Sequence, residues 1–209
     1  MSHYTVAPFP PNEAERYQRL LDYEILDTPH ELEYDDFTAL ATRLFRVPIA
    51  LISLIDEDRQ WFKSKVGFDL DSTPRATAFC AHAILGSDLL VVEDAALDAR
   101  FEESPLVRGH PHIRFYAGCP LISPEGFALG TLCIVDRAPR TLTIEEADTL
   151  RRMSRQLMNL LELRRAGVFQ RNCQAKLQEQ ASELEKLALV AERTSNVVIM
   201  ADPHGLITW

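Results

Sequence analysis

Cys80 and His82 are the residues of this sequence whose types and spacing come nearest to a catalytic or metal-binding pair. A thiolate beside an imidazole can act as a nucleophile, and both side chains ligate metal ions. Residues two positions apart on a helix point to different faces, however, and the surrounding sequence supplies neither an orienting carboxylate nor further ligands. We therefore expect both side chains to pack in the fold, and we predict no catalytic residue and no metal site.

A second group of residues has the chemistry to hold a small molecule. Arg75, His82, Arg114 and Tyr116 combine hydrogen-bond donors with an aromatic face, which suits a small anionic or planar ligand. Alternation along a strand places Arg114 and Tyr116 on the same face. The whole set of expected ligand contacts is Arg75, Phe79, Cys80, His82, Arg114, Tyr116 and Cys119.

Arg114 also admits a structural role. In that alternative its guanidinium pairs with an acidic neighbour, Asp56 or Asp94, and Tyr116 only packs. The sequence leaves both alternatives open. It also leaves open the identity of the ligand and of any cofactor.

The other cysteines and histidines carry weaker signals. Four cysteines without C-x-x-C spacing argue against a disulfide framework and a structural zinc site, and they favour a reducing, cytoplasmic setting. Cys133 lies in an apolar run and is expected in the core. His110 and His112 have a spacing seen at metal or haem sites, but we expect both to be exposed in a loop.

Composition restricts the class of protein. The chain has 209 residues, of which 46% are hydrophobic and 25% charged, as in a globular protein with one main domain. A formal charge of −9 opposes binding to nucleic acid, and no apolar stretch is long enough to span a membrane. The basic cluster of the terminal helix is interleaved with acidic residues and is expected to form a solvated face of mixed charge: Arg151, Arg152, Arg155, Arg164 and Arg165.

Two helices and then a sheet are needed to position these residues. Residues 1–11, with three prolines in four positions, predict an irregular lead-in. Asn12 is a candidate N-cap for the first helix, and Thr28 with Pro29 marks the turn to a second. The second helix is expected to bury one apolar stripe against the sheet, formed by Phe37, Leu40, Ala41 and Leu44.

The strand signals predict an α+β fold with five to six antiparallel strands. Residues 49–55 form a nearly continuous apolar run, which is typical of a central strand. Residues 60–66 alternate and predict a hairpin partner with one wetter face. Further strands are expected at 89–93, 113–117, 119–122 and 127–135, with a short helix at 78–85 and a turn at 123–126.

From Thr143 onward the period becomes helical. Thr143 and Glu146 form a capping-box pattern at the start of a long helix. An amphipathic helix that leaves its domain has nothing of its own to bury against, so we expect it to pair with a second copy as a coiled coil. The residues expected at this homodimer contact are Leu150, Met153, Leu157, Leu160, Leu161, Leu177, Leu184 and Leu187.

Four ordered blocks of sequence together resemble the GAF domains of bacterial signalling proteins. They are LIDEDRQWFKS (54–64), CAHAI (80–84), IRFYAG (113–118) and GTLCIVD (130–136). The resemblance covers residues 16–165. It implies a GAF-like central sheet flanked by helices and a sensory or regulatory role, with a small-molecule ligand or a partner that the sequence does not identify.

The resemblance also bears on alternatives. Some phytochrome-like GAF domains attach a bilin through a cysteine, usually in a Cys-His pair, whereas this chain has Cys119 before Pro120. The Asn-Lys-Phe-Asp-Glu signature of cyclic-nucleotide-binding GAF domains is missing. A GAF-fold thiol enzyme of the free methionine sulfoxide reductase type needs two or three cysteines that converge on the pocket, and Cys80 and Cys119 within disulfide reach would favour it. A ligand-free dimerisation spacer is the third alternative.

These observations give an expected organisation of lead-in (1–11), GAF domain (12–165), coiled-coil linker (166–192) and the start of a PAS domain (193–209). The last stretch resembles a PAS opening that stops in mid-strand. By resemblance, the output domain of a longer protein is a diguanylate cyclase or a histidine kinase. The fragment itself is expected to be a sensor that relays its state through the terminal helix, and not an enzyme.

Overall fold

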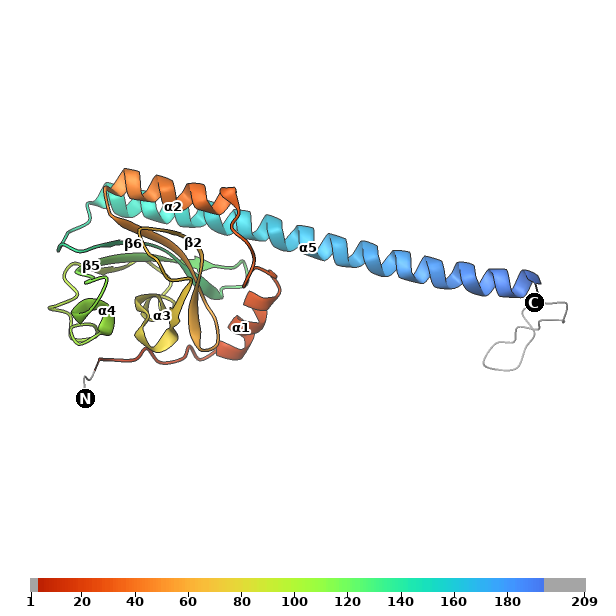
Figure 1. Ribbon diagram of the computed structural model, residues 1–209, viewed down its shortest axis with the longest axis horizontal. Helices are drawn as coiled ribbons and strands as arrows, with labels where there is room; N and C mark the ends of the chain where they lie inside the picture. The colour runs from red at the N-terminus through yellow and green to blue at the C-terminus, as the bar shows by residue number, and fades with distance from the viewer. Residues whose placement is uncertain (1–3, 194–209) are drawn as a thin grey trace. The chain divides into compact units, whose positions relative to one another are not determined.

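A six-stranded antiparallel sheet forms the centre of the computed structural model, which describes residues 4–193 (Figure 1). The strand order is β3-β2-β1-β6-β5-β4. The strands are β1 (Ile49–Ile55), β2 (Arg59–Val66), β3 (Ser72–Pro74), β4 (Leu90–Val92), β5 (Phe115–Ile122) and β6 (Ala128–Asp136). The helices are α1 (Glu13–Leu21), α2 (Leu32–Phe45), the 3₁₀ helix η1 (Arg75–Thr77), α3 (Phe79–Ala83), α4 (Pro105–Arg108) and α5 (Ile144–Arg193). The expected fold class is confirmed.

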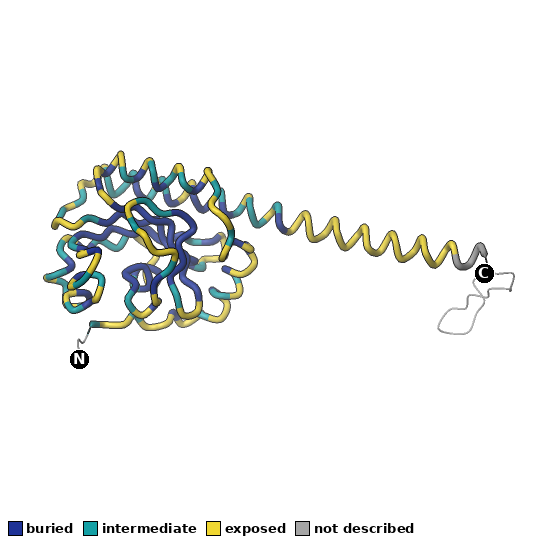
Figure 2. The backbone as a smooth tube through the Cα atoms, viewed as in Figure 1, coloured by how far each residue is buried: buried dark blue, intermediate teal, exposed yellow. Residues whose placement is uncertain are grey.

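Both faces of the sheet are covered, which explains why β1 is apolar at nearly every position. Ala50, Ile52 and Leu54 face one core with α1, α2 and the first part of α5. Ile49 and Leu51 face a second core beneath α3, α4 and their loops. Figure 1 shows α2 and the first part of α5 along one face and α3 and α4 on the other, and Figure 2 shows the buried sheet between the two layers. Because side chains alternate along a strand, the strands β1, β2, β4, β5 and β6 contribute to both cores.

The predicted hairpin of β1 and β2 is confirmed. The wetter face expected for β2 is wrong, because Lys63 and Ser64 are buried there under α2 and its preceding loop. The two strands expected at 113–117 and 119–122 are a single strand, β5. Pro120 is tolerated within it because β4 pairs only as far as Gly118, so no partner on that side needs the missing N–H.

Helix α2 buries a different stripe from the one expected. Tyr34, Thr38, Ala41 and Phe45 are the buried residues, with Phe37 packed partly against them. Leu40 and Leu44 are instead 52% and 57% exposed, respectively, which corrects the prediction. The apolar residues of α2 cover more than one face, and only the packing against the sheet selects which of them is buried.

The N-terminal segment is irregular, as expected, but it is held against the domain. The backbone N–H of Thr5 donates to the carbonyl of Arg100, and the Phe9 ring lies 4.4 Å from the guanidinium of Arg75. Asn12 occupies the N-cap position of α1, yet its side chain makes no capping hydrogen bond. Instead its carbonyl accepts from the N–H of Arg16.

Helix α5 crosses from one compact unit, which ends at Arg165, into a second that starts at Ala166. The capping box is confirmed: Thr143 Oγ1 accepts from Glu146 N at 3.1 Å, and Glu146 Oε2 accepts from Thr143 N at 2.9 Å. In the first unit the expected dimer residues Leu150, Leu157 and Leu161 are buried in the core of their own chain.

This burial corrects the role given to Leu150, Leu157 and Leu161. Met153 and Leu160 also pack partly against the same core, so the apolar stripe up to Leu161 is explained without a second copy. Leu177, Leu184 and Leu187 of the second unit are exposed. Dimerisation thus stays a prediction that rests on the second unit. The expected PAS opening, residues 194–209, lies outside the described residues.

Candidate functional site

A small cavity lies between the second face of the sheet and the layer formed by α3, α4 and the loops around them. Its volume is about 30 Å³, enough for about one water molecule. Apolar side chains dominate the wall. The lining residues are Ile49, Leu51, Gln60, Phe62, Phe68, Thr73, Phe79, Cys80, Leu106, Pro111, Ile113, Tyr116, Cys133 and Val135.

Two polar atoms in this wall are buried without a hydrogen-bond partner. They are Oε1 of Gln60 on β2 and Oγ1 of Thr73 on β3. Each residue is 5% exposed, and the two are directly paired across the strands. A buried polar group without a partner costs about 1–3 kcal/mol, so a pair of them beside a cavity marks a place for a hydrogen-bonding ligand or water.

A cluster of sulfur and hydroxyl groups surrounds Cys80 of α3, which lines the same cavity. Thr131 Oγ1 donates to the Cys80 sulfur at 3.0 Å, and the phenol of Tyr116 donates to it at 3.3 Å. The sulfur of Cys133 lies 3.8 Å from that of Cys80. Ser53 Oγ is 4.0 Å from the sulfur of Cys133. All of these residues except Cys80 come from the three central strands β1, β6 and β5.

The cluster shifts the pKa values of Cys80 and Cys133 in opposite directions. Burial raises the pKa of Cys80, but hydrogen bonds from Cys133, Thr131 and Tyr116 to its sulfur outweigh burial and bring the pKa to about 7. The hydrogen bond to Cys80, together with burial, raises the pKa of Cys133 well above its ordinary value. Burial also raises the pKa of the Tyr116 phenol, followed by the charge of Cys80. The first proton to leave this cluster therefore comes from Cys80.

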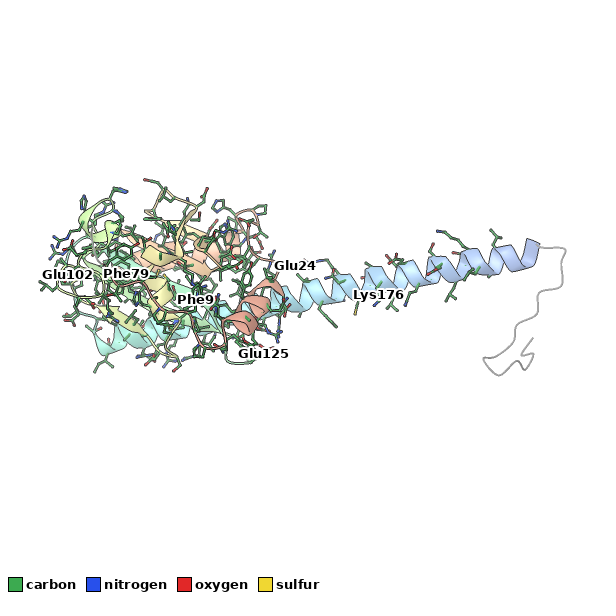
Figure 3. The ribbon with its side chains drawn as sticks, turned by 90° about the horizontal axis from the view of Figure 1, so that it is seen from below. Phe9, Glu24, Phe79, Glu102, Glu125 and Lys176 are labelled. Atoms are coloured by element: carbon green, nitrogen blue, oxygen red, sulfur yellow. The ribbon has the colours of Figure 1, made fainter. Side chains whose placement is uncertain are left out.

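Local packing holds the ring of Tyr116 and the helix α3 in place. Gly118 lies two residues along β5 from Tyr116, and a Cβ there would come within 2.0 Å of the Tyr116 hydroxyl. The absence of a side chain at Gly118 therefore makes room for the phenol. Phe79, labelled in Figure 3, stacks on Phe101 with ring centroids 4.0 Å apart, which anchors α3 to the neighbouring loop.

Of the seven residues expected at a ligand, three line the cavity: Phe79, Cys80 and Tyr116. Arg75 does not. Its guanidinium donates to a carboxylate oxygen of Glu13 and, at 2.9 Å, to the carbonyl of Asp56. Its role in this structure is to join α1 to the loop between β1 and β2.

The remaining three residues lie elsewhere. Arg114 pairs with Asp94 at the edge of the sheet, which is one of the two structural partners foreseen for it. His82 Nε2 lies 3.0 Å from the carbonyl of Thr5, and burial lowers the pKa of the imidazole. Cys119 belongs to the other core, on the opposite face of the sheet from Cys80.

The position of Cys119 bears on the thiol-enzyme alternative. The pair expected to favour it, Cys80 and Cys119, does not converge, because the sheet separates the two residues, and Cys119 lines a separate pocket of about 230 Å³ with Ser154 of α5. His110 and His112 are exposed, as expected. Within residues 4–193, no group of three or more histidine, cysteine or acidic side chains is arranged to hold a metal ion.

Sequence reasoning missed Gln60, Thr73, Thr131 and the contact made by Cys133. A signal for Thr131 was present, because a polar residue interrupts the apolar run of β6 two positions before Cys133 and so shares its face. Gln60 similarly shares a face of β2 with Phe62. Their convergence on α3 depends on the order of strands in the sheet, which no local pattern specifies.

No helix within the described part of the chain combines the length and the apolar character that crossing a bilayer requires.

Comparison with known proteins agrees with this architecture. The family model of the GAF domain matches residues 30–161. Over 133 residues, 64% of this chain, the sequence is 46% identical to the cyclic di-GMP phosphodiesterase PA2567 of Pseudomonas aeruginosa. The matched part is 23% of that protein.

Solved structures show the same fold at low identity. The GAF domain from the Acinetobacter phosphoenolpyruvate-protein phosphotransferase has a TM-score of 0.56 at 16% identity, over 76% of this chain and 97% of that one. The blue-light absorbing form of the PixJ GAF domain from Thermosynechococcus elongatus has a TM-score of 0.52 at 13% identity, over 82% and 98%. With the family model matching more than half of its residues, the chain belongs to the GAF domain family.

Proposed function

We propose that this chain is a sensory module that binds a small, largely apolar molecule in the cavity beneath α3. The observation that carries the proposal is the pair of unpartnered buried atoms, Gln60 Oε1 and Thr73 Oγ1, in an otherwise apolar wall. The amide of Gln60 offers an acceptor and the hydroxyl of Thr73 both a donor and an acceptor. A planar molecule with one amide-like or hydroxyl group matches this arrangement.

Ligand binding in this site requires a conformational change. A cavity of about 30 Å³ holds no organic molecule, so the layer above the sheet must move outward to admit one. The movable part of the wall includes Phe79 on α3, Leu106 on α4 and the loop residue Pro111. A ligand then shifts the population toward the open arrangement by the difference between its affinities for the two states.

The signal is proposed to pass through α5 in a homodimer. Residues 169–189 of α5 are all exposed, and they include Leu177, Leu184 and Leu187 at spacings of seven and three. Figure 3 shows the side chains of this part of the helix, around Lys176, with no other element of their own unit over them. An apolar stripe of this spacing is covered when two such helices pair as a coiled coil.

The resemblance to the phosphodiesterase of Pseudomonas aeruginosa bears on the output. Because 46% identity links this module to one part of that protein, we propose that it regulates an adjoining domain that acts on cyclic di-GMP. Of the two outputs expected by resemblance, a diguanylate cyclase or a histidine kinase, the cyclase acts within the same signalling chemistry. The match covers only 23% of that phosphodiesterase. Activity on cyclic di-GMP is therefore proposed for an adjoining domain and not for the residues described above.

Native mass spectrometry of the protein purified from its own host tests ligand binding directly, because it reports the copy number and any retained small molecule together. A complementary test adds benzamide and its ring-methylated derivatives and measures the melting temperature. A ligand at 100 times its dissociation constant stabilises the protein by about 2.7 kcal/mol. The Gln60→Leu variant is expected to lose this stabilisation, while Gln18→Leu on the exposed surface of α1 keeps it.

A ligand-free spacer is the second candidate, favoured by the small size of the cavity. If the domain is a spacer, the native mass spectrum shows no retained molecule and no member of the benzamide series raises the melting temperature. Gln60→Leu then only stabilises the protein, because it removes an unpartnered buried oxygen. A retained molecule that disappears in Gln60→Leu excludes the spacer.

A further inference from the structure

Cys80 and Cys133 form a buried dithiol that ligand binding does not explain. Their sulfurs are 3.8 Å apart, in van der Waals contact, although one residue is on the helix α3 and the other on the central strand β6. Both thiols are free. The other two cysteines lie apart from them, Cys119 in the opposite core and Cys173 exposed on the second unit.

The surroundings favour negative charge on one sulfur only. Thr131 and Tyr116 both direct hydroxyl donors at Cys80, and within the described residues no carboxylate is hydrogen bonded to either thiol. A thiolate that accepts several hydrogen bonds is formed more readily than a thiol buried among apolar groups. Cys133, in contrast, remains protonated beside it, so the pair combines a nucleophile with a neighbouring thiol.

Access to the pair is through the ligand cavity. Both cysteines line it, and most of the wall is apolar and none of it charged, which excludes charged reagents more strongly than neutral ones. The space holds about one water molecule, so the smallest hydroperoxides fit best. Glutathione disulfide, large and charged, does not fit.

We propose that Cys80 and Cys133 are an oxidative modification site, at which a small uncharged hydroperoxide converts the dithiol to a disulfide. The Cys80 thiolate attacks the terminal oxygen of ROOH, the O–O bond breaks, and RO⁻ leaves and takes up the proton released by the thiol. The products are Cys80 sulfenic acid and ROH. The sulfur of Cys133 then attacks the sulfenic sulfur, forming the S–S bond and releasing water.

Overall, two thiols are oxidised, one hydroperoxide is reduced, and one ROH and one water are formed. The disulfide needs the sulfurs about 1.8 Å closer than they are, since an S–S bond is about 2.05 Å long. The short helix α3 can supply this movement, because β6 is held between two neighbouring strands. Oxidation therefore draws the roof of the cavity toward the sheet.

The experiment uses the Cys119→Ser/Cys173→Ser double variant, which keeps only the proposed pair. After treatment with hydrogen peroxide we expect a mass loss of about 2 Da, no thiol that can be alkylated under denaturing conditions, and full reversal by dithiothreitol. A protein that keeps both thiols under peroxide that oxidises Cys173 in the unmodified chain overturns the proposal. The proposal is also overturned if the protein gains oxygen atoms one at a time, as its mass would show, and forms no disulfide.

Single variants test the order of events. Cys133→Ser is expected to accumulate a sulfenic acid on Cys80 that dimedone traps, whereas Cys80→Ser gives no adduct on Cys133. Equal trapping on the two residues contradicts the assigned roles. Thr131→Val should slow disulfide formation about fivefold near neutral pH, as a one-unit rise in a thiol pKa of about 7 does, while Thr149→Val on α5, where the hydroxyl donates only to the carbonyl of Glu145, leaves the rate unchanged. Circular dichroism of each reduced variant verifies that it is folded.

This inference does not rest on the proposed ligand. Gln60→Leu removes the ligand contact but leaves both sulfurs in place, so in the Cys119→Ser/Cys173→Ser background it should still form the disulfide. If Gln60→Leu loses benzamide binding and still forms the disulfide, the two properties are independent. If the unmodified protein shows only one of the two properties, only the other proposal fails.

Discussion

The ammonium group of Lys63, which is 1% exposed, lies 2.7 Å from a carboxylate oxygen of Glu31. The same carboxylate accepts hydrogen bonds from Arg164 of α5 at 2.8 and 3.0 Å. Lys63 also donates to Thr28 Oγ1 and to the carbonyl of Pro29. One acidic residue thus joins a sheet strand to the helix that leaves the domain.

Replacing Glu31 should destabilise the domain more than replacing its partner. Glu31→Gln leaves a fully buried ammonium without its counter-charge, and we expect a loss of about 2 kcal/mol, below the 3–5 kcal/mol of fully buried pairs because Glu31 is partly exposed. Lys63→Met removes the buried charge itself and should cost about 1 kcal/mol, since Arg164 still pairs with Glu31. Urea unfolding of both variants measures the two losses in unfolding free energy. A larger loss in Lys63→Met than in Glu31→Gln contradicts the prediction.

Acid stability should depend on Glu13. Burial raises the pKa of this carboxyl, but its hydrogen bonds and charge interactions with Arg16 and Arg75 dominate and lower the pKa from 4.5 to about 2. A depressed pKa contributes stability that is complete above about pH 4.5 and is lost as the pH falls toward 2. The difference in unfolding free energy between the unmodified chain and Glu13→Gln should therefore shrink across this window. A difference that stays constant from pH 6 to pH 2.5 contradicts the assignment.

Gly118→Ala should disturb the sulfur cluster through Tyr116. The new Cβ meets the Tyr116 hydroxyl at 2.0 Å, so the ring must move away from Cys80, at a cost of about 1–3 kcal/mol. Loss of this donor also raises the pKa of Cys80, so in the Cys119→Ser/Cys173→Ser background the thiol should react more slowly with hydrogen peroxide near neutral pH. Gly86→Ala is the matched control, because its nearest neighbour would be 3.9 Å away. Equal stability of the two variants contradicts the prediction.

Dimerisation should depend on the second unit of α5. Leu177→Glu with Leu184→Glu places charges in the exposed apolar stripe, and analytical ultracentrifugation should then show a single copy instead of two. Leu40→Glu with Leu44→Glu on the exposed face of α2 is the control, and it should leave the dimer intact. If the substitutions on α2 abolish the dimer and those on α5 do not, the interface lies on α2. If the unmodified protein is already monomeric, the proposed signalling through paired α5 helices is wrong.

Local patterns anticipated the elements better than they anticipated the contacts. The run at β1, the capping box of α5 and the turn before β6 depend on neighbouring residues, and all were identified from the sequence. Leu40 and Leu150 show where the patterns failed. Both belong to apolar stripes, yet one is exposed and the other lies in the core of its own chain. Periodicity shows that a face is apolar, whereas the partner that covers it depends on packing.

The sequence by itself determined the family, an antiparallel sheet flanked by helices and the apolar character of α5, because these follow from short-range spacing and from ordered blocks of residues. Only the tertiary structure decided that Cys80 meets Cys133 and not Cys119, and that Gln60 and Thr73 border the cavity. The reason is geometric: the face on which a strand residue lies is set by alternation, but the elements that face it are set by strand order and by helices placed far away in the chain.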